Sequence, residues 1–229
     1  MQDINDLISK LRSGSAKNQL KLITQLVEIG DAGYQAIMAW LLETKGQVPT
    51  NATGKAYQVI YEANTPETKG FLESNFPSGV VTLSSDQGVD YSNLQNLLAQ
   101  REFERADVVT MQKLCELAGA SAVERKWLYF TEVDGLPTTD LQTIDKLWRV
   151  HSEGKFGFSV QRKIWLSVGK DFTKLWPKIE WKEGNNWTRY PGEFTWDLSA
   201  PKGHLPLSNQ LRGVRVIDAI FKHPAWEKK

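Results

Sequence analysis

Residues 20–41, LKLITQLVEIGDAGYQAIMAWL, carry the clearest structural pattern in this 229-residue sequence. Apolar side chains recur at every third or fourth position on both sides of Gly30, which is the spacing of one helix face. Glycine is the usual residue just beyond the end of a helix, and Asp31 suits the first turn of the next one. The stretch therefore predicts two consecutive amphipathic helices joined at Gly30.

The same helical spacing extends to both sides of this stretch. One stripe lies at residues 4–11 and another at residues 57–61, and Phe71 with Leu72 marks a fifth short helix. No repeat of fixed length is visible, and this part of the chain contains no histidine or cysteine. We therefore expect an N-terminal helical bundle over residues 1–80, without chemistry of its own.

Loop residues separate this bundle from a second set of helices. Residues 76–91, FPSGVVTLSSDQGVDY, are rich in proline, glycine and serine, and predict a linker. Beyond it, apolar stripes predict a helical core domain over residues 84–229, with Ser159 as the N-cap of one helix. A terminal helix is expected over residues 205–221. The predicted fold class is all-α.

Charges and aromatic residues are unevenly distributed along the chain. The net charge is −1 over residues 1–83, −6 over residues 84–145 and +8 over residues 146–229, and eight of nine tryptophans lie at or after Trp127. Residues 180–205 are loop-like yet rich in aromatic side chains, and loops of that length are usually functional. This pattern suggests a site for a flat, apolar, anionic ligand, with tryptophan packing in the core as the alternative.

Sequence motifs of common catalytic and metal sites are absent. There is no glycine-rich phosphate loop, no H-E-x-x-H and no G-x-S-x-G. The three histidines are widely spaced, and the single cysteine, Cys115, lies in an apolar helical pattern that predicts a core position. We therefore expect neither a metal site nor a catalytic site.

Five tryptophan-rich blocks in the C-terminal part resemble the Genomes Uncoupled Four family. They are WLYFTEV (127–133), FGFSVQRKIWL (156–166), FTKLWPKIEWK (172–182), FTWDLSAPKGHLPL (194–207) and NQLRGVRV (209–216). The similarity covers residues 84–229 and continues more loosely into the N-terminal bundle, as in cyanobacterial members. The resemblance implies an all-helical core shaped like a cupped hand. It also implies a regulator that binds protoporphyrin and magnesium protoporphyrin and stimulates magnesium chelatase in chlorophyll synthesis. The partner that the resemblance implies is the large porphyrin-binding subunit of that enzyme.

A porphyrin is an apolar disc with two propionates on one edge, so its site needs apolar walls and cations at the rim. With the family resemblance, the expected porphyrin-binding residues are Phe103, Val133, Trp187, Arg189, Tyr190, Phe194, Leu211, Arg212 and Arg215. We expect Arg212 and Arg215 to bind propionates. Ordinary surface charge, or pairing of Arg215 with Asp218, is the alternative for the arginines, and loop packing for Trp187 and Trp196.

Two positions depart from the family pattern. Tyr190 stands where the family often has a tryptophan, and Met111 stands where it often has an arginine. The first change reduces the flat apolar area, and the second removes a candidate rim cation.

Three other functions stay open on sequence alone. An enzyme acting on a tetrapyrrole would have Asp197, His204 or Glu193 as its loop acid or base, and a protein–protein adaptor would use the tryptophan-rich loop without binding pigment. Nucleic-acid binding is disfavoured because the positive charge forms no continuous patch. The N-terminus lacks the pattern of a signal or transit peptide, so we expect a cytoplasmic protein, with peripheral thylakoid contact left open.

Overall fold

The computed structural model describes residues 4–208 and 214–227. Within these ranges the regular structure is helical, apart from strands β1 (Lys182–Glu183) and β2 (Asn186–Trp187), which pair antiparallel. The all-α prediction is therefore confirmed. Among the described residues, no helix is both long and apolar enough to cross a bilayer.

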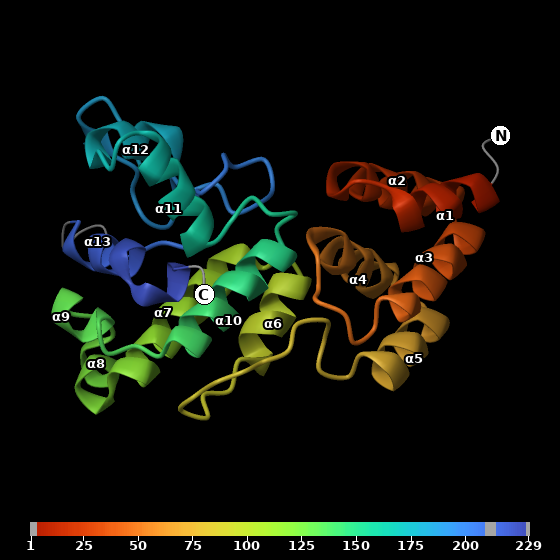
Figure 1. Cartoon of the computed structure of the whole chain (residues 1–229), viewed down its shortest axis with the longest axis horizontal. Coiled ribbons are helices and arrows are strands. Elements are labelled where there is room, and N and C mark those ends of the chain that lie inside the picture. The colour runs from red at the N-terminus through yellow and green to blue at the C-terminus, as the bar shows by residue number, and fades with distance from the viewer. Residues whose placement is uncertain (1–3, 209–213, 228–229) are drawn as a thin grey trace. The chain divides into compact units, whose positions relative to one another are not determined.

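The chain divides into two compact units. Unit 1 comprises the chain up to Thr82 together with Val150–Glu153, and unit 2 comprises Leu83–Arg149 and the chain from Gly154 onward. The helices of unit 1 run from red to orange in Figure 1: α1 (Ile4–Ser13), α2 (Ala16–Ile29), α3 (Asp31–Glu43), α4 (Asn51–Ala63) and α5 (Pro66–Asn75). Successive helices pack together, and their apolar stripes form the core of the unit.

Helices α2 and α3 meet at a glycine that the sequence pattern did not single out. A Cβ atom placed on Gly33 would lie 1.7 Å from the backbone oxygen of Leu26, so the two helix backbones touch here. Gly30 between them has a φ of 83° and donates its N–H to the oxygen of Val27, which confirms the predicted helix end. The junction therefore depends on two glycines for two different reasons.

Neighbouring side chains satisfy the first turns of α4 and α5. The hydroxyl of Thr50 accepts from the N–H of Thr53, and the hydroxyl of Thr53 accepts from the N–H of Thr50, each at 3.2 Å. Thr65 and Thr68 form the same reciprocal pair at the start of α5. These capping boxes occupy helix-start donors that would otherwise lack partners.

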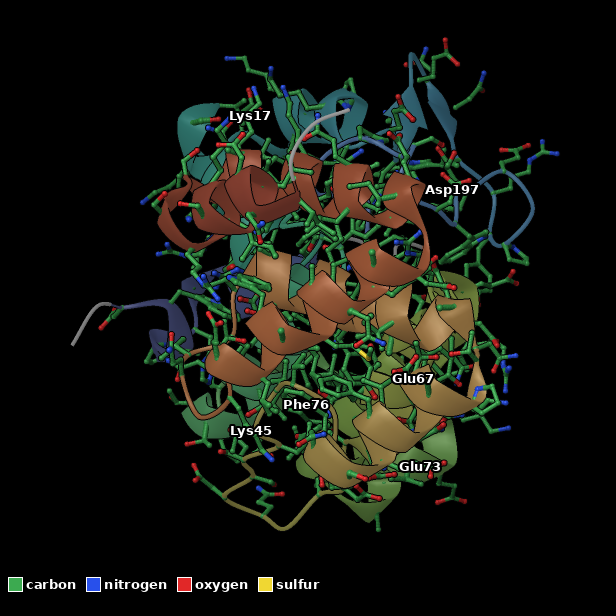
Figure 2. All side chains as sticks on the ribbon, turned by 90° about the vertical axis from the view of Figure 1, so that its right-hand side faces the viewer. Lys17, Lys45, Glu67, Glu73, Phe76 and Asp197 are labelled. Carbon is green, nitrogen blue, oxygen red and sulfur yellow. The ribbon has the colours of Figure 1, made fainter. Side chains whose placement is uncertain are left out.

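An aromatic cluster lies at the edge of the core of unit 1. The rings of Tyr57 and Phe76 meet edge to face, with centroids 6.5 Å apart. Lys45 Nζ lies 5.7 Å from the centroid of the Phe76 ring, and both residues are labelled in Figure 2. Tyr57 also packs against the ring of His151, which is fully buried. Gln58 Nε2 donates to the backbone oxygen of His151 at 2.8 Å, so the short segment 150–153 is anchored within unit 1.

Unit 2 contains the remaining elements, which run from yellow-green to blue in Figure 1 and include the β1–β2 hairpin. Its helices are α6 (Ser92–Ala99), α7 (Phe103–Ala118), α8 (Ala120–Arg125), α9 (Phe130–Val133), α10 (Thr138–Val150), α11 (Phe158–Ser167), α12 (Phe172–Lys178), α13 (Arg215–Lys222) and the 3-10 turn η2 (Pro224–Trp226). The last residue of α10, Val150, belongs to unit 1. Buried tryptophans fill much of the core: Trp148, Trp165, Trp176 and Trp181. For these four, the core alternative is the correct one.

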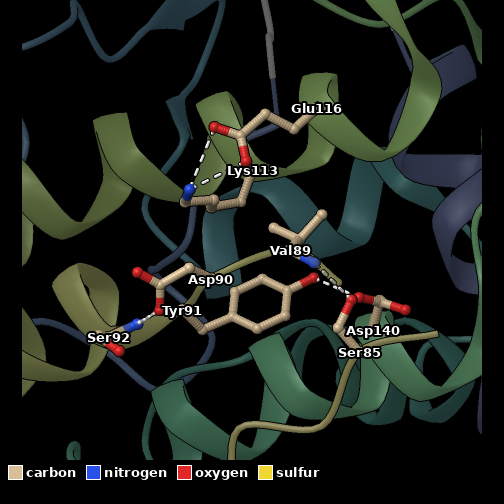
Figure 3. A network of polar contacts seen from close by, with 8 residues as sticks. All are labelled: Ser85, Val89, Asp90, Tyr91, Ser92, Lys113, Glu116 and Asp140. Carbon is tan, nitrogen blue, oxygen red and sulfur yellow. Dashed lines mark hydrogen bonds and ion pairs between the residues drawn. The ribbon is translucent and has the colours of Figure 1, made fainter. Parts of the chain in front are cut away.

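The segment before α6 is non-helical, as predicted, and is held by buried polar contacts (Figure 3). The hydroxyl of Tyr91 donates to Asp140 Oδ1 at 2.7 Å, and the N–H of Asp86 donates to Asp140 Oδ2 at 2.9 Å. The hydroxyl of Ser85 accepts from the N–H of Val89. One carboxyl group of α10 therefore fixes a loop more than 45 residues away in the sequence.

Two predicted helix starts in unit 2 are wrong. Gly157, not Ser159, occupies the N-cap of α11, and Ser159 lies inside the helix, where its N–H and hydroxyl donate to Asp145. The carboxyl group of Asp145, in the preceding helix, accepts the hydrogen bond that a local N-cap side chain was expected to accept. The last helix begins at Arg215, and residues 205–208 are not helical.

Candidate functional site

A cavity of about 730 Å³ lies within unit 2. Its described lining comes from α7, α8 and two loops: Asp107, Val108, Met111, Gln112, Cys115, Glu116, Val123, Lys126, Tyr190, Leu207 and Ser208. Sites for drug-sized ligands usually measure about 300–1,000 Å³ and combine apolar walls with a few polar groups. The cavity has the size and the mixed lining of a small-molecule site.

Helix α7 supplies one wall of the cavity. Asp107, Met111 and Cys115 are spaced four residues apart, so they lie on one face of the helix. Cys115 is buried and burial raises the pKa of its thiol to about 11, so it acts there as an apolar group. The wall is apolar at its centre and carries a carboxyl group at Asp107.

Asp107 also holds the loop that lines the cavity beyond residue 206. The N–H of Leu207 donates to Asp107 Oδ1 at 2.6 Å, across 100 positions of sequence. Burial raises the pKa of Asp107 to about 7, while the Leu207 N–H acts in the opposite direction and Glu104 adds a small like-charge effect. This contact couples the ionisation of one buried carboxyl to the placement of the loop.

Two further side chains, those of Gln161 and Trp181, hold the same loop by hydrogen bonds to its backbone. Gln161 Nε2 donates to the backbone oxygens of Gly203 and Pro206, at 3.0 and 2.8 Å, and the indole N–H of Trp181 donates to the oxygen of His204 at 2.7 Å. Gln161 and Trp181 are both fully buried. The loop is therefore rigidly anchored up to residue 208, where it reaches the cavity.

Tyr190 reaches the cavity from the aromatic loop and is half exposed. Its ring packs edge-on against Trp196, with centroids 5.9 Å apart, and the Trp196 indole N–H donates to the oxygen of Pro191. Desolvation raises the pKa of Tyr190, with smaller contributions from the charges of Asp107 and Glu104. A neutral, flat phenol with one open face is suited to stacking against a planar ligand.

The predicted binding residues are dispersed in the described structure. Tyr190 lines the cavity, whereas Phe103, Val133 and Phe194 are buried, Phe103 against Trp148. These three side chains belong to the core of unit 2, and their contact with a ligand stays a prediction.

The cationic and exposed members of the predicted set have other neighbours. Trp187 is 44% exposed and its ring centroid lies 5.6 Å from that of Trp176. The Arg189 side chain is 87% exposed, and the Arg215 guanidinium lies 5.3 Å from the ring centroid of Phe130. Leu211 and Arg212 lie outside the described residues, so their role stays a prediction.

Sequence reasoning missed most of the cavity lining. Asp107 and Lys126 were not singled out, and Cys115 was expected in the core without contact to a cavity. Met111 was noted as a departure from the family pattern, and it does line the cavity. The i, i+4 spacing on α7 was visible, but a polar residue within an apolar stripe gives no sign of facing a cavity rather than solvent.

Two of the three histidines, His204 and His223, are hydrogen-bonded away from the cavity. His204 Nε2 accepts from the N–H of Thr195, so its Nδ1 carries the proton and donates to the oxygen of Ile179. His223 is held in the same way by the N–H of Ala225 and the oxygen of Leu136. Within the described ranges, no group of three or more histidine, cysteine or acidic residues is arranged to hold a metal ion.

The three candidate acids and bases of the enzyme alternative hold turns. Asp197 accepts from the N–H of Ser199, Glu193 accepts from the N–H of Arg189, and both nitrogens of His204 are engaged. None of the three belongs to the described lining of the cavity. The described part of the site is suited to binding and offers these groups no place in a reaction.

Family models match both parts of the chain. Residues 84–224 match the model described as GUN4-like, and residues 1–77 match the model described as ARM-like repeat domain, GUN4-N terminal. Together they cover nearly the whole sequence.

Individual relatives agree with these matches. The chain is 49% identical to the Ycf53-like protein of Synechocystis sp., over 99% of this chain and 97% of the relative. It is 44% identical to the chloroplastic tetrapyrrole-binding protein of Arabidopsis thaliana, over 58% of this chain and 54% of the relative.

Two solved structures are similar to the described fold. GUN4 from Chlamydomonas reinhardtii is 45% identical with a TM-score of 0.61, covering 65% of this chain and 95% of that one. Ligand-free GUN4 from Arabidopsis thaliana is 42% identical with a TM-score of 0.57, covering 63% of this chain and 99% of that one.

Proposed function

Because the chain belongs to the GUN4-like family, we propose that it binds protoporphyrin and magnesium protoporphyrin in the cavity of unit 2 and thereby stimulates magnesium chelatase. The observation that carries the proposal is the cavity itself: about 730 Å³, with an apolar α7 wall and the open face of Tyr190. A plant relative is named for tetrapyrrole binding. The function is that of a regulator or carrier, without catalysis of its own.

The cavity residues have distinct tasks in this proposal. Met111 and Cys115 on α7, with Val123 on α8, offer apolar contact to the macrocycle, and Tyr190 covers one of its faces. Arg212 and Arg215, which we expect to bind propionates, stay part of the proposal. Burial of the ring supplies most of the affinity, because apolar contact grows with the area removed from water.

The proposed ligand does not require a metal. Both ring nitrogens of His204 and of His223 are already engaged, and His151 is buried in unit 1. No histidine is therefore available as an axial ligand for magnesium. We expect metal-free porphyrin to bind as well, and strict dependence on magnesium would contradict this part of the proposal.

A size argument limits the expected affinity. A porphyrin has roughly 40 heavy atoms, and ligands of that size gain about −0.3 kcal/mol per atom, which sets a ceiling of about −12 kcal/mol. That ceiling corresponds to a dissociation constant of about 1 nM. A protein that passes its ligand on must release it, so we expect a constant of about 1 μM or somewhat below.

A titration with deuteroporphyrin or protoporphyrin, followed by tryptophan fluorescence, tests the proposal. Eight of nine tryptophans lie in residues 127–226, so bound pigment should quench most of the emission in a saturable way. The Arg212→Ala plus Arg215→Ala variant should bind more weakly. A double variant of α12, Lys174→Ala plus Lys178→Ala, removes the same charge from exposed positions and should bind normally.

Chelatase stimulation is the second stage of the test. The protein should raise the rate of magnesium insertion by the complete chelatase, and the arginine variant should do so less at limiting porphyrin. Stimulation by a chain that shows no quenching at tens of micromolar pigment would favour a protein–protein adaptor. Absence of both effects would refute the proposed function.

A further inference from the structure

Among the described lining residues of the cavity, Lys126 is the only cation. It follows directly after α8, its side chain is exposed, and it forms no ion pair with any described residue. An ammonium group at the wall of a cavity of mixed apolar and polar lining is a natural partner for an anionic group on a ligand.

Cations close to Lys126 in the sequence are already paired. Arg125 donates twice to Glu132, at 2.7 and 2.8 Å, and its guanidinium lies 4.3 Å from the ring centroid of Tyr129. Lys113 on α7 pairs with Glu116 at 2.9 Å. The charge of Lys126 is therefore the one that these contacts leave available to a ligand.

The backbone at Lys126 has a conformation that is unusual for a lysine. Lys126 has a φ of 63°, in the left-handed region, and its N–H donates to the oxygen of Ala122 at 2.8 Å. Glycine or asparagine is the usual residue at such a helix end, because other side chains are strained there. The end of α8 therefore fixes the backbone of Lys126 next to the cavity that its side chain lines.

Other charges on the wall restrict how an anionic ligand is oriented. Asp107 and Glu116 both line the cavity as carboxyl groups, and Met111 is uncharged. A carboxyl group offers no cation to the anionic edge of a ligand, and neither does Met111. Within the described lining, the favourable place for that edge is beside Lys126.

We propose that Lys126 binds a carboxylate of the cavity ligand, so that a planar dicarboxylic ligand enters with its acidic edge toward the end of α8. This proposal rests on the proposed function, since it names the residue that reads the acidic edge of the same ligand. In this chain, Lys126 supplies a rim cation that Met111 lacks.

The test compares two pigments that share one macrocycle and differ in whether their two carboxyl groups are charged or methylated. Lys126→Gln removes the cation at similar length, and protoporphyrin and its dimethyl ester are titrated against each variant by tryptophan fluorescence. We expect about fivefold weaker binding of the free acid and unchanged binding of the ester, because a partly exposed charge pair is worth a modest factor. Lys126→Arg should restore binding of the free acid, and the difference between the two pigments should shrink at high salt.

A matched control comes from the end of α11. Lys170 has a φ of 62°, is exposed, and does not line the cavity. Lys170→Gln therefore repeats the same charge loss at the same backbone conformation, and should leave both pigments unaffected.

Three outcomes decide the matter. Equal binding of the free acid by Lys126→Gln and the parent chain would overturn the proposal. An equal loss for acid and ester would overturn it as well, because the effect would then come from packing. If the parent chain binds neither pigment, the proposed function fails, and the assignment of Lys126 falls with it.

Discussion

Units 1 and 2 are both helical, but different kinds of interaction fix their connecting segments. In unit 1 the starts of α4 and α5 are capped by neighbours three residues away, Thr50 with Thr53 and Thr65 with Thr68. In unit 2 the loops are held by buried side chains from distant parts of the chain, as when Asp107 accepts from the N–H of Leu207. Local contacts make a regular scaffold, whereas long-range contacts shape a cavity.

The two units also bury titratable groups of opposite kind. Unit 1 encloses His151, and burial lowers its pKa to about 3. Unit 2 encloses Asp107, and burial raises its pKa to about 7. Each group favours its neutral form, so the two units should lose stability in opposite directions of pH.

The largest difference in stability between the two units is expected from a substitution at the contact between α2 and α3 in unit 1. Gly33→Ala would place a methyl group 1.7 Å from the Leu26 oxygen, so α2 and α3 must separate. We expect a loss of about 3 kcal/mol in unit 1, because neither backbone can yield locally. Hydrogen exchange of peptides from each unit measures this, and unit 2 should be unaffected. A uniform loss in both units would show that they unfold together.

Removing the charge of Asp107 should affect only unit 2, with an effect that grows above about pH 4 and is complete above about pH 7. The raised pKa means that the folded state keeps a proton which the unfolded chain loses above about pH 4, so stability falls as pH rises to about 7. In Asp107→Asn the amide oxygen still accepts from Leu207. We expect about 2 kcal/mol of added stability at pH 8 and little change at pH 4, measured by urea unfolding of both proteins.

In unit 1 the buried His151 should give the opposite pH dependence, with stability lost toward acid pH. His151 has no described partner for either ring nitrogen, and its folded pKa lies far below the unfolded value of 6.5. The unfolded chain takes up the proton first as pH falls, so stability is lost from about pH 6.5 downward. At pH 5 the loss is about 2 kcal/mol. His151→Phe keeps a ring against Tyr57 and should flatten this acid dependence of exchange in unit 1.

How far the sequence predicts each unit follows from the same distinction. The stripes of α2 and α3 and the helix end at Gly30 were predictable, because helix spacing and terminal glycine act within a few residues. In unit 2 the position of α11 was predicted, but its cap was not. Asp145 supplies that cap from 14 positions away, and no local pattern encodes a partner at that distance.

The candidate site shows the same limit. Tyr190 was predicted to bind a ligand and lines the cavity, since an exposed aromatic residue in a long loop is conspicuous. Phe103 and Val133 were chosen for their apolar character, which equally predicts a core position, and the structure buries both. The sequence does not reveal Asp107 and Lys126 as lining residues. The cavity forms only when α7 and α8 pack beside a loop that lies almost 100 residues later in the sequence.

A smaller loss of stability is expected in unit 2 from the contact that holds the segment before α6. Tyr91→Phe removes the hydroxyl that donates to the buried Asp140 (Figure 3). That carboxyl group then keeps the N–H of Asp86. We expect a loss of about 1.5 kcal/mol in unit 2 by urea unfolding, the cost of one buried hydrogen bond to a carboxyl group. Tyr61→Phe in unit 1 is the control, because Tyr61 is 41% exposed and should tolerate the change. If both variants lost the same stability, buried polar contacts would not distinguish unit 2 from unit 1.

The smallest effect should be a gain, and it tests whether unit 1 is limited by local propensity. Gly70 lies inside α5, and a Cβ placed there would meet nothing within 4 Å. Gly70→Ala therefore reduces the conformational freedom of the unfolded chain without a clash, and should stabilise unit 1 by about 0.5–1 kcal/mol. Slower exchange of peptides from α4 and α5 would measure it. Since Gly33→Ala makes the identical chemical change, opposite signs at the two positions would isolate helix contact from propensity, and a loss at both would show that α5 makes a close contact of its own.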